Sequence, residues 1–207
     1  MPWKKVSSEL IESLAIGRSS HIRPRLTRPA DCHFMATIFP QPPTRPESPD
    51  PMVWPRAPGA YALVLHLTVP IAVRVGRLGV WALPSGWHVY VGSALGAGGL
   101  RGRLARHFRA EKKLRWHIDY VMAASIDISE VWYVESSARW ECIWARQLAA
   151  LPGARVLIPR FGAGDCRCPS HLLSFETFPP FEAFAQQVNE LGCGAIRRFL
   201  RQPRLPS

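Results

Sequence analysis

Two tyrosines, an arginine and a histidine have the side chains and the spacing to bind and act on a phosphate group. Tyr61 opens an alternating apolar segment, and Tyr90 lies near the end of a later one. Arg103 and His107 are four residues apart, which places them on the same face of a helix. A guanidinium presents a fixed fork of donors to phosphoryl oxygens, and a phenol or imidazole can orient or deprotonate water. These residues predict a phosphate-binding site wherever the fold brings them together.

The elements that must position these residues begin at Gly59, where the sequence pattern changes. Alternation and turn residues predict strands over residues 61–68, 71–75, 78–83, 87–92 and 130–135, and extended segments over 155–158 and 171–175. Apolar spacing of three and four predicts helices over residues 100–111, 115–124, 137–151, 180–189 and 193–201. This order predicts an α+β fold, a small, mainly antiparallel sheet flanked by helices.

Antiparallel pairing would bring the four residues together. If the strands at 61–68 and 87–92 are neighbours, Tyr61 and Tyr90 come to the same end of the sheet. The glycine-rich turn and the helix that carries Arg103 begin at that end too.

Proline content divides the chain. Residues 1–58 hold eleven of its 20 prolines, a density that blocks both helix and sheet and predicts a disordered N-terminal extension. We expect a folded domain over residues 59–178 and a helical C-terminal tail over 179–207.

The charge predicts a polyanionic partner. Lys and Arg number 26 against 15 Asp and Glu, a net charge of +11. More than half of this net positive charge comes from residues 101–115, a segment whose only acidic residue is Glu111. Its bases are Arg101, Arg103, Arg106, Arg109, Lys112, Lys113 and Arg115. A solvated helix normally mixes signs, so this run predicts a face that binds the backbone of DNA, with RNA not excluded. No membrane partner is expected, because proline and glycine interrupt the two uncharged stretches, 57–73 and 80–100.

The five cysteines favour a cytoplasmic protein. Their number is odd, they show no disulfide framework, and charged residues such as Lys4 and Lys5 interrupt any signal-peptide pattern. A structural Zn²⁺ site is conceivable at Cys166, Cys168 and His171, with Cys142 or Cys193 as the fourth ligand. Because a Cys-x-Cys pair is tighter than the usual zinc spacing, the favoured interpretation is a polar loop that closes over the active site. His117 could add to the site or bond within the fold.

The same residues resemble those of a known family. Gly59-Ala60-Tyr61 and Tyr90-Val91-Gly92 resemble the two motifs of GIY-YIG nucleases, and residues 103–108 resemble the Arg-x-x-Arg-His-Phe run on their first helix. A closer resemblance is to the DUF123 branch, some of whose archaeal members are fused to endonuclease III. It rests on residues 90–94, 116–120 and 161–172 and covers about 59–175.

The resemblance implies phosphodiester hydrolysis with one divalent cation, Mg²⁺ or Mn²⁺. The family's metal-binding glutamate corresponds to Glu141, its phosphate-binding arginine to Arg103, and its proposed general base to Tyr61. Activation of metal-bound water with help from His107 is a substitute for the tyrosine base.

Two departures from the family pattern leave alternatives open. The glycine segment lengthens the gap between Tyr90 and the helix arginine, so Arg101 and Arg106 remain rivals of Arg103. A late asparagine of the family has no counterpart here, and Asp165 or His171 could take its role.

The resulting hypothesis is a metal-dependent endonuclease that acts on DNA in repair or processing, with DNA-repair proteins as further partners. The alternative is a non-catalytic nucleic-acid-binding module with a GIY-YIG-like fold, which would use the same basic segment.

Overall fold

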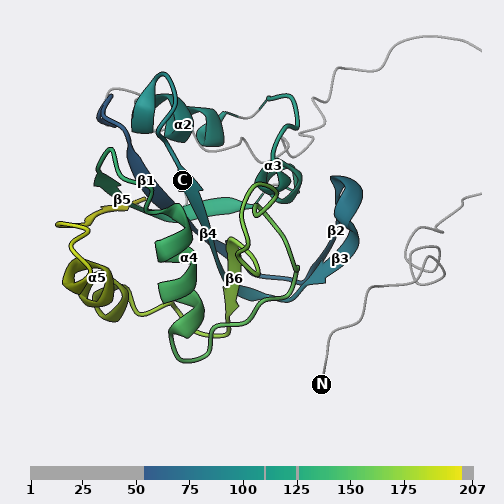
Figure 1. The fold of residues 1–207 in the computed structure, drawn as a ribbon. Coiled ribbons are helices and arrows are strands. Elements are labelled where there is room, and N and C mark those ends of the chain that lie inside the picture. Colours follow the sequence, from purple (N-terminus) through teal and green to yellow (C-terminus); the bar gives the residue numbers. More distant parts are fainter. Residues whose placement is uncertain (1–53, 110, 125, 202–207) are drawn as a thin grey trace, which may run out of the picture. The chain divides into compact units, whose positions relative to one another are not determined.

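The computed structural model describes residues 54–201 except residues 110 and 125 (Figure 1). Most of the predicted N-terminal extension and the last residues of the predicted tail therefore lie outside the described residues. The strands are β1 (Gly59–Leu67), β2 (Ile71–Val75), β3 (Gly79–Leu83), β4 (Gly86–Ser93), β5 (Asp127–Glu135), β6 (Leu172–Phe175) and β7 (Arg197–Leu200). The helices are α2 (Gly99–Phe108), α3 (His117–Met122), α4 (Glu141–Ala150), α5 (Phe181–Glu190) and a short 3-10 turn, η2 (Gly76–Leu78).

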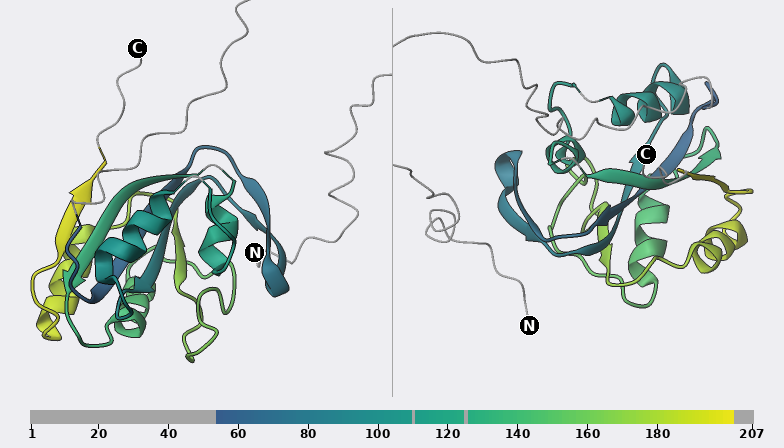
Figure 2. Two further views of the ribbon diagram at one scale, coloured as in Figure 1. Left: turned by 90° about the horizontal axis from the view of Figure 1, so that it is seen from above. Right: turned by 180° about the vertical axis from the view of Figure 1, so that it is seen from behind.

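Five strands form one sheet in the order β6-β4-β1-β5-β7, and each neighbouring pair is antiparallel. Strands β2 and β3 form a separate antiparallel hairpin. Helices lie on both sides of the sheet, as the turned views in Figure 2 show. The predicted α+β fold with a mainly antiparallel sheet flanked by helices is confirmed.

Strand β1 is buried on both faces because helices pack on both sides of the sheet. Leu63 and Leu65 join a core with α2 and α3, whereas Ala62 and Val64 join a second core with α4 and α5. The alternation in the sequence predicted that the second face of this strand would be half-buried. The small residues of that face are fully buried under the aromatic side chains of α4 and α5.

Trp54, the first of the described residues and five residues before Gly59, is already part of the domain's core. The Trp54 ring is 1% exposed and meets Phe108, Tyr133 and Phe199, with ring centroids 6.1, 5.8 and 4.7 Å away. Its carbonyl oxygen accepts a hydrogen bond from Arg101 Nε at 2.9 Å. The proline content predicted that residues 54–58 belong to the N-terminal extension. They pack instead against the start of α2.

Three helices are shorter than predicted. Helix α2 ends at Phe108, so Arg109 and the bases after it lie in a connecting segment. Helix α3 ends at Met122. Helix α4 begins at Glu141 with Trp140 as its N-cap residue, so neither Ser136 nor Ser137 caps it. The Ser136 hydroxyl oxygen instead accepts bonds from the Ala138 amide and the Trp140 indole.

The helix predicted over residues 193–201 is wrong, because Arg197–Leu200 forms strand β7. This segment pairs with the open edge of β5, where Val131 lies opposite Phe199. Gly192 and Gly194, both in the left-handed region, separate it from α5. Edge pairing therefore overrides the helical apolar spacing. The extended segment predicted at 155–158 forms only a single bridge, between Arg155 and Ser174.

Among the described residues, no helix is both long and apolar enough to cross a bilayer.

Gly92 allows the Tyr61 side chain to lie flat against β4. The two residues are directly opposite in the β1–β4 register, and a Cβ atom on Gly92 would overlap the Tyr61 ring. We expect Gly92→Ala to lower the free energy of unfolding by about 1–3 kcal/mol, the usual cost of overpacking a core. Urea unfolding measures the change. Gly102→Ala in α2, where the nearest atom to the new Cβ is 3.8 Å away, is the control and should not destabilise the protein. Equal stability of the two variants would contradict this packing.

Candidate functional site

Residues from β1, β4, α2, α4 and four connecting segments meet around a pocket of about 320 Å³. Five of the predicted site residues line it: Tyr61, Tyr90, Arg103, Glu141 and Asp165. The remaining lining residues are Ser93, Leu95, Gly96, Trp116, Arg139 and Gly162. The pocket thus combines two phenols, two guanidinium groups and two carboxylates.

The register of β1 and β4 brings the tyrosines together. Tyr61 pairs with Gly92, and Tyr90 pairs with Leu63, so the tyrosines are diagonal neighbours. Both are at least nine-tenths buried within the core that α2 and α3 cover. Their rings nevertheless reach the pocket wall.

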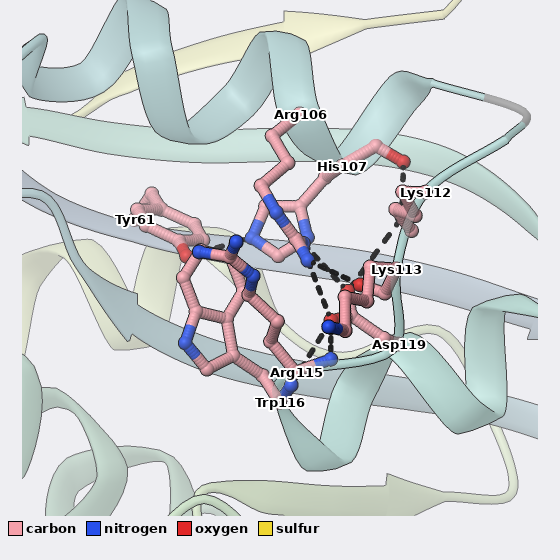
Figure 3. Close-up of polar contacts among 8 residues, drawn as sticks. All are labelled: Tyr61, Arg106, His107, Lys112, Lys113, Arg115, Trp116 and Asp119. Atoms are coloured by element: carbon pink, nitrogen blue, oxygen red, sulfur yellow. Dashed lines mark hydrogen bonds and ion pairs between the residues drawn. The ribbon is translucent and has the colours of Figure 1, made fainter.

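His107 lies behind Tyr61 and does not line the pocket. Its Nε2 atom is 2.8 Å from the Tyr61 hydroxyl, and the residue is fully buried (Figure 3). Burial, with a further contribution from Lys112, lowers the pKa of His107 to about 3. The imidazole is therefore neutral near pH 7. The structure makes it a buried partner of Tyr61, and its catalytic role stays a prediction.

Both tyrosines are protonated near neutral pH. Burial raises the pKa of Tyr61 well above its usual value; Tyr90 and Glu141 raise it further, and Arg103 opposes them. Burial and Glu141 likewise raise the pKa of Tyr90. In this state the Tyr61 hydroxyl can hold a water molecule by a hydrogen bond, but it does not carry the negative charge of a strong base.

Arg103 is the helix arginine that reaches the pocket. Its guanidinium carbon lies 4.5 Å from the centre of the Trp116 ring. Arg101, one of its rivals, donates from Nε to the Trp54 carbonyl oxygen. Arg106, the other, forms an ion pair with Asp119 at 2.8 Å. Arg106 also lies over Trp116, with its guanidinium carbon 4.1 Å from the ring centre, so Arg103 differs from its two rivals in that it lines the pocket.

Asp119 organises the segment between α2 and α3. Its carboxylate accepts two bonds from the Arg106 guanidinium, at 2.8 and 2.9 Å, and one each from the amides of Arg115 and Trp116 (Figure 3). Lys112 Nζ lies 3.8 Å away and donates to the His107 carbonyl oxygen. This network fixes Trp116, and with it one wall of the pocket.

The predicted nucleic-acid-binding residues consequently differ in exposure. Arg106 and Lys112 turn inward to Asp119, whereas Arg109, Lys113 and Arg115 are exposed. The helix predicted over residues 100–111 is shorter than expected, so only Arg101, Arg103 and Arg106 of the basic run belong to α2.

Glu141 connects the pocket with a second cluster of side chains. Its Oε1 atom lies 3.2 Å from Nδ1 of buried His171, close enough for an ion pair but not aligned for a hydrogen bond. Burial opposes charge on His171, yet the Glu141 carboxylate raises its pKa overall. A carboxylate has further lone pairs, so a cation bound by Glu141 would share the carboxylate with His171.

Cys142, Cys166, Cys168 and His171 form a group that could hold a metal ion. Their donor atoms all lie within 4.8 Å of one another, and the described cysteines are free. The tight Cys-x-Cys spacing favoured a polar loop here, with Cys142 and Cys193 as alternative fourth ligands of a zinc ion. The structure brings Cys142 to the group, while Cys193 accepts a bond from the Trp144 indole instead.

His117 supports the pocket from outside. Its Nδ1 atom accepts a hydrogen bond from the amide of Gly162, a lining residue, at 2.9 Å. Burial lowers the pKa of His117. Of its two predicted alternatives, the structure shows bonding within the fold.

The sequence patterns did not indicate Ser93, Arg139 or Trp116 as pocket residues. Ser93 follows the Tyr-Val-Gly motif directly, and Arg139 stands two residues before Glu141. Neighbouring positions in the motifs could have indicated both. Trp116 is half-buried between core and pocket, and its spacing from Tyr120 is that of a core residue on a helix.

Comparison with known proteins gives one family. The model of the family described as a domain of unknown function, DUF123, matches residues 60–193, a span that contains every pocket residue. No curated protein and no solved structure matches the chain.

The Asp119 network makes stability depend on pH in a defined direction. Burial alone would raise the pKa of Asp119, but the Arg106 guanidinium and the amides of Trp116 and Arg115 lower it to about 2. A lowered pKa contributes stability above the unfolded value, near pH 4, that is lost as pH falls towards 2. We expect Asp119→Asn to lose about 2 kcal/mol of unfolding free energy at pH 7.

Chemical denaturation at several pH values measures this loss. The difference between wild type and Asp119→Asn should shrink as pH falls from about 4 to about 2. Asp127→Asn, at an exposed carboxylate 3.3 Å from Arg201, is the control and should differ little from wild type. A loss for Asp119→Asn that does not change with pH would contradict the assignment.

Proposed function

The chain belongs to the DUF123 family, and from that premise we propose that it is a metal-dependent endonuclease that hydrolyses phosphodiester bonds in DNA. The observation that carries the proposal is the convergence of Tyr61, Arg103 and Glu141 on one pocket. These three side chains come from β1, α2 and α4, which are far apart in the sequence. Their chemistry suits an attack of water on a phosphate group.

A relationship to GIY-YIG nucleases is part of this proposal. The two motifs that resemble that family lie on neighbouring strands, and Gly92 of the second motif makes room for Tyr61 of the first. This contact gives a physical reason for the residue types at both motifs.

Arg103 would bind the scissile phosphate. Its guanidinium lies over the Trp116 ring, a contact that limits its movement and keeps it at the pocket wall. A preorganised positive charge next to a phosphoryl group stabilises the charge that develops in the transition state. Arg139, which lies just before α4 and also lines the pocket, adds a second positive charge.

Glu141 and Asp165 give the pocket the oxygen ligands that Mg²⁺ or Mn²⁺ prefers. Glu141 would hold the ion, with Asp165 beside it. Bound there, a divalent cation would supply Lewis-acid polarisation of a phosphoryl oxygen. The negative charges of the two carboxylates also offset the positive charges of the two arginines, so the pocket can accept a cation.

Tyr61 would position the attacking water. Its hydroxyl is held by His107 at 2.8 Å, and its raised pKa keeps it protonated. A fixed, neutral hydroxyl can orient water next to a phosphate that Arg103 binds. The role of general base that the family resemblance implies requires the pKa of this phenol to fall when a cation enters the pocket.

DNA is the proposed substrate, and DNA-repair proteins are proposed partners. Arg109, Lys113 and Arg115 are exposed in the segment that leads to Trp116 at the pocket wall. They can neutralise backbone phosphates on either side of the cleaved bond. The resemblance to domains fused to endonuclease III supports a place in repair.

A non-catalytic nucleic-acid-binding module remains the second candidate. The contact between Glu141 and His171 favours it, because an ion pair there competes with a cation for the same carboxylate.

Cleavage of supercoiled plasmid tests the first proposal. With Mg²⁺ or Mn²⁺ we expect nicking, a loss of at least about 100-fold in rate for Arg103→Ala, and no measurable cleavage for Glu141→Gln. Glu176→Gln is the control, since this exposed carboxylate pairs with Arg155 and does not line the pocket. Single-turnover rates at saturating DNA separate chemistry from binding.

The outcomes distinguish the two candidates. If the protein binds DNA but does not cleave it with any metal tested, only the binding-module candidate remains. Cleavage that survives Glu141→Gln would contradict the assigned site. RNA and branched, nicked or abasic DNA, supplied in parallel, define the substrate.

Salt dependence tests the exposed bases separately. If Arg115 contacts a phosphate, Arg115→Ala should reduce the slope of log K against log salt by about 0.9, or by about 0.7 on single-stranded substrate. Fluorescence anisotropy with labelled DNA measures the slope. Arg197→Ala is the control, because this side chain pairs with Glu135 at the sheet edge. An unchanged slope for Arg115→Ala would exclude that contact.

A further inference from the structure

We infer that Cys142, Cys166, Cys168 and His171 bind one structural zinc ion, at a site separate from the proposed catalytic cation. Three thiols and one imidazole are a donor set typical of structural zinc. The soft sulfur donors distinguish this site from the carboxylates of the pocket, which suit Mg²⁺ or Mn²⁺. The inference rests on these four residues and does not depend on the proposed nuclease activity.

The spacing of the donor atoms fits a single tetrahedral ion. Zinc bonds of about 2.3 Å to sulfur and 2.0–2.1 Å to nitrogen separate two sulfurs by about 3.8 Å and a sulfur from a nitrogen by about 3.6 Å. The four donors lie within 4.8 Å of one another, and Cys166 Sγ lies 3.4 Å from His171 Nε2. Shifts of the side chains alone could therefore bring all four atoms into coordination.

The backbone that carries the ligands is built for this arrangement. Arg160 adopts a φ of 63°, which is unusual for a residue other than glycine. From this position its guanidinium donates to the carbonyl oxygens of Cys166 and Cys168, at 2.6 and 3.3 Å. Two backbone bonds, from the Arg160 amide to the Pro169 carbonyl and from the His171 amide to the Phe161 carbonyl, close the loop. The Cys-x-Cys pair is thus held in a fixed turn, which compensates for its tight spacing in sequence.

Glu141 completes the surroundings of a zinc-bound histidine. When Nε2 of His171 faces the cysteines, Nδ1 faces Glu141 Oε1 at 3.2 Å. Zinc-bound histidines usually donate their second ring N–H to a carboxylate or carbonyl, which fixes the tautomer and the ring orientation.

The ion would fasten two separate parts of the pocket wall. Cys142 lies in the first turn of α4 next to Glu141, and Cys166 and Cys168 lie in the loop that contributes Gly162 and Asp165 to the pocket. Four protein ligands leave no open coordination position, so the role of the ion is structural.

Metal analysis of the untagged full-length chain tests the inference. After expression with zinc and removal of loose metal, mass spectrometry of the dissolved protein should find about one zinc ion per chain. Cys166→Ser and Cys168→Ser should each lower that content at least about fivefold. Cys193→Ser is the matched control and should retain zinc, because Cys193 bonds to Trp144 and lies outside the group.

A second measurement uses the wild-type chain, so it tests the zinc site even if the cysteine variants fail to fold. Cobalt introduced into the wild-type chain should give the thiolate-to-cobalt charge transfer and the visible bands of a tetrahedral sulfur site, and zinc should displace it. Hydrogen exchange of residues 160–171 should rise when a chelator removes the metal and fall again with zinc but not with magnesium.

Four results would overturn the inference: wild-type protein without zinc, equal zinc in Cys166→Ser and Cys193→Ser, iron in place of zinc, or a disulfide between two of the cysteines. None of these measurements involves DNA cleavage. An inactive protein with stoichiometric zinc would contradict the proposed function and leave the zinc site standing.

Discussion

The pairing of β1 with β4 is the constraint on which the pocket depends. Its register puts Tyr61 opposite Gly92, the residue that leaves room for the ring, and makes Tyr90 the diagonal neighbour on the same face. A slip of β1 by one residue would turn Tyr61 to the other core, away from Tyr90. Because β1 is central and buried on both faces, that slip would also misplace the two apolar sets that hold α2 and α4. The position of the pocket tyrosines therefore follows from the same contacts that stabilise the sheet.

A buried carboxylate then divides the basic residues into two classes. Asp119 holds Arg106 and lies near Lys112, and its depressed pKa shows that the charge is strongly stabilised. Arg103, one helical turn before Arg106, is left to the pocket. Net charge alone could not make this distinction, because a positive charge paired inside the fold adds little to the attraction for a polyanion.

Local sequence patterns were sufficient where local rules decide the structure. They predicted the strands around Tyr61 and Tyr90 and the α+β fold, because alternation and turn residues act over a few positions. They failed at β7, where Arg197–Leu200 pairs with an open strand edge that no local pattern reveals. They also failed to separate Cys142 from Cys193, since that choice depends on how α4 packs against a loop about twenty residues later. Roles at the site that came from the family resemblance remain predictions.

Glu141 lies where the two proposed metal sites meet, and its two oxygens reconcile them. A zinc ion on Nε2 would leave the hydrogen of His171 on Nδ1, and a small rotation of the ring or the carboxylate would align it with Oε1 of Glu141, 3.2 Å away. That bond would fix the rotation of the carboxylate, and the second oxygen would then be the one available to a cation in the pocket. The contact between Glu141 and His171 would in that case orient a ligand instead of competing for it. The observation that favours a binding module without zinc thus favours an enzyme once zinc is bound.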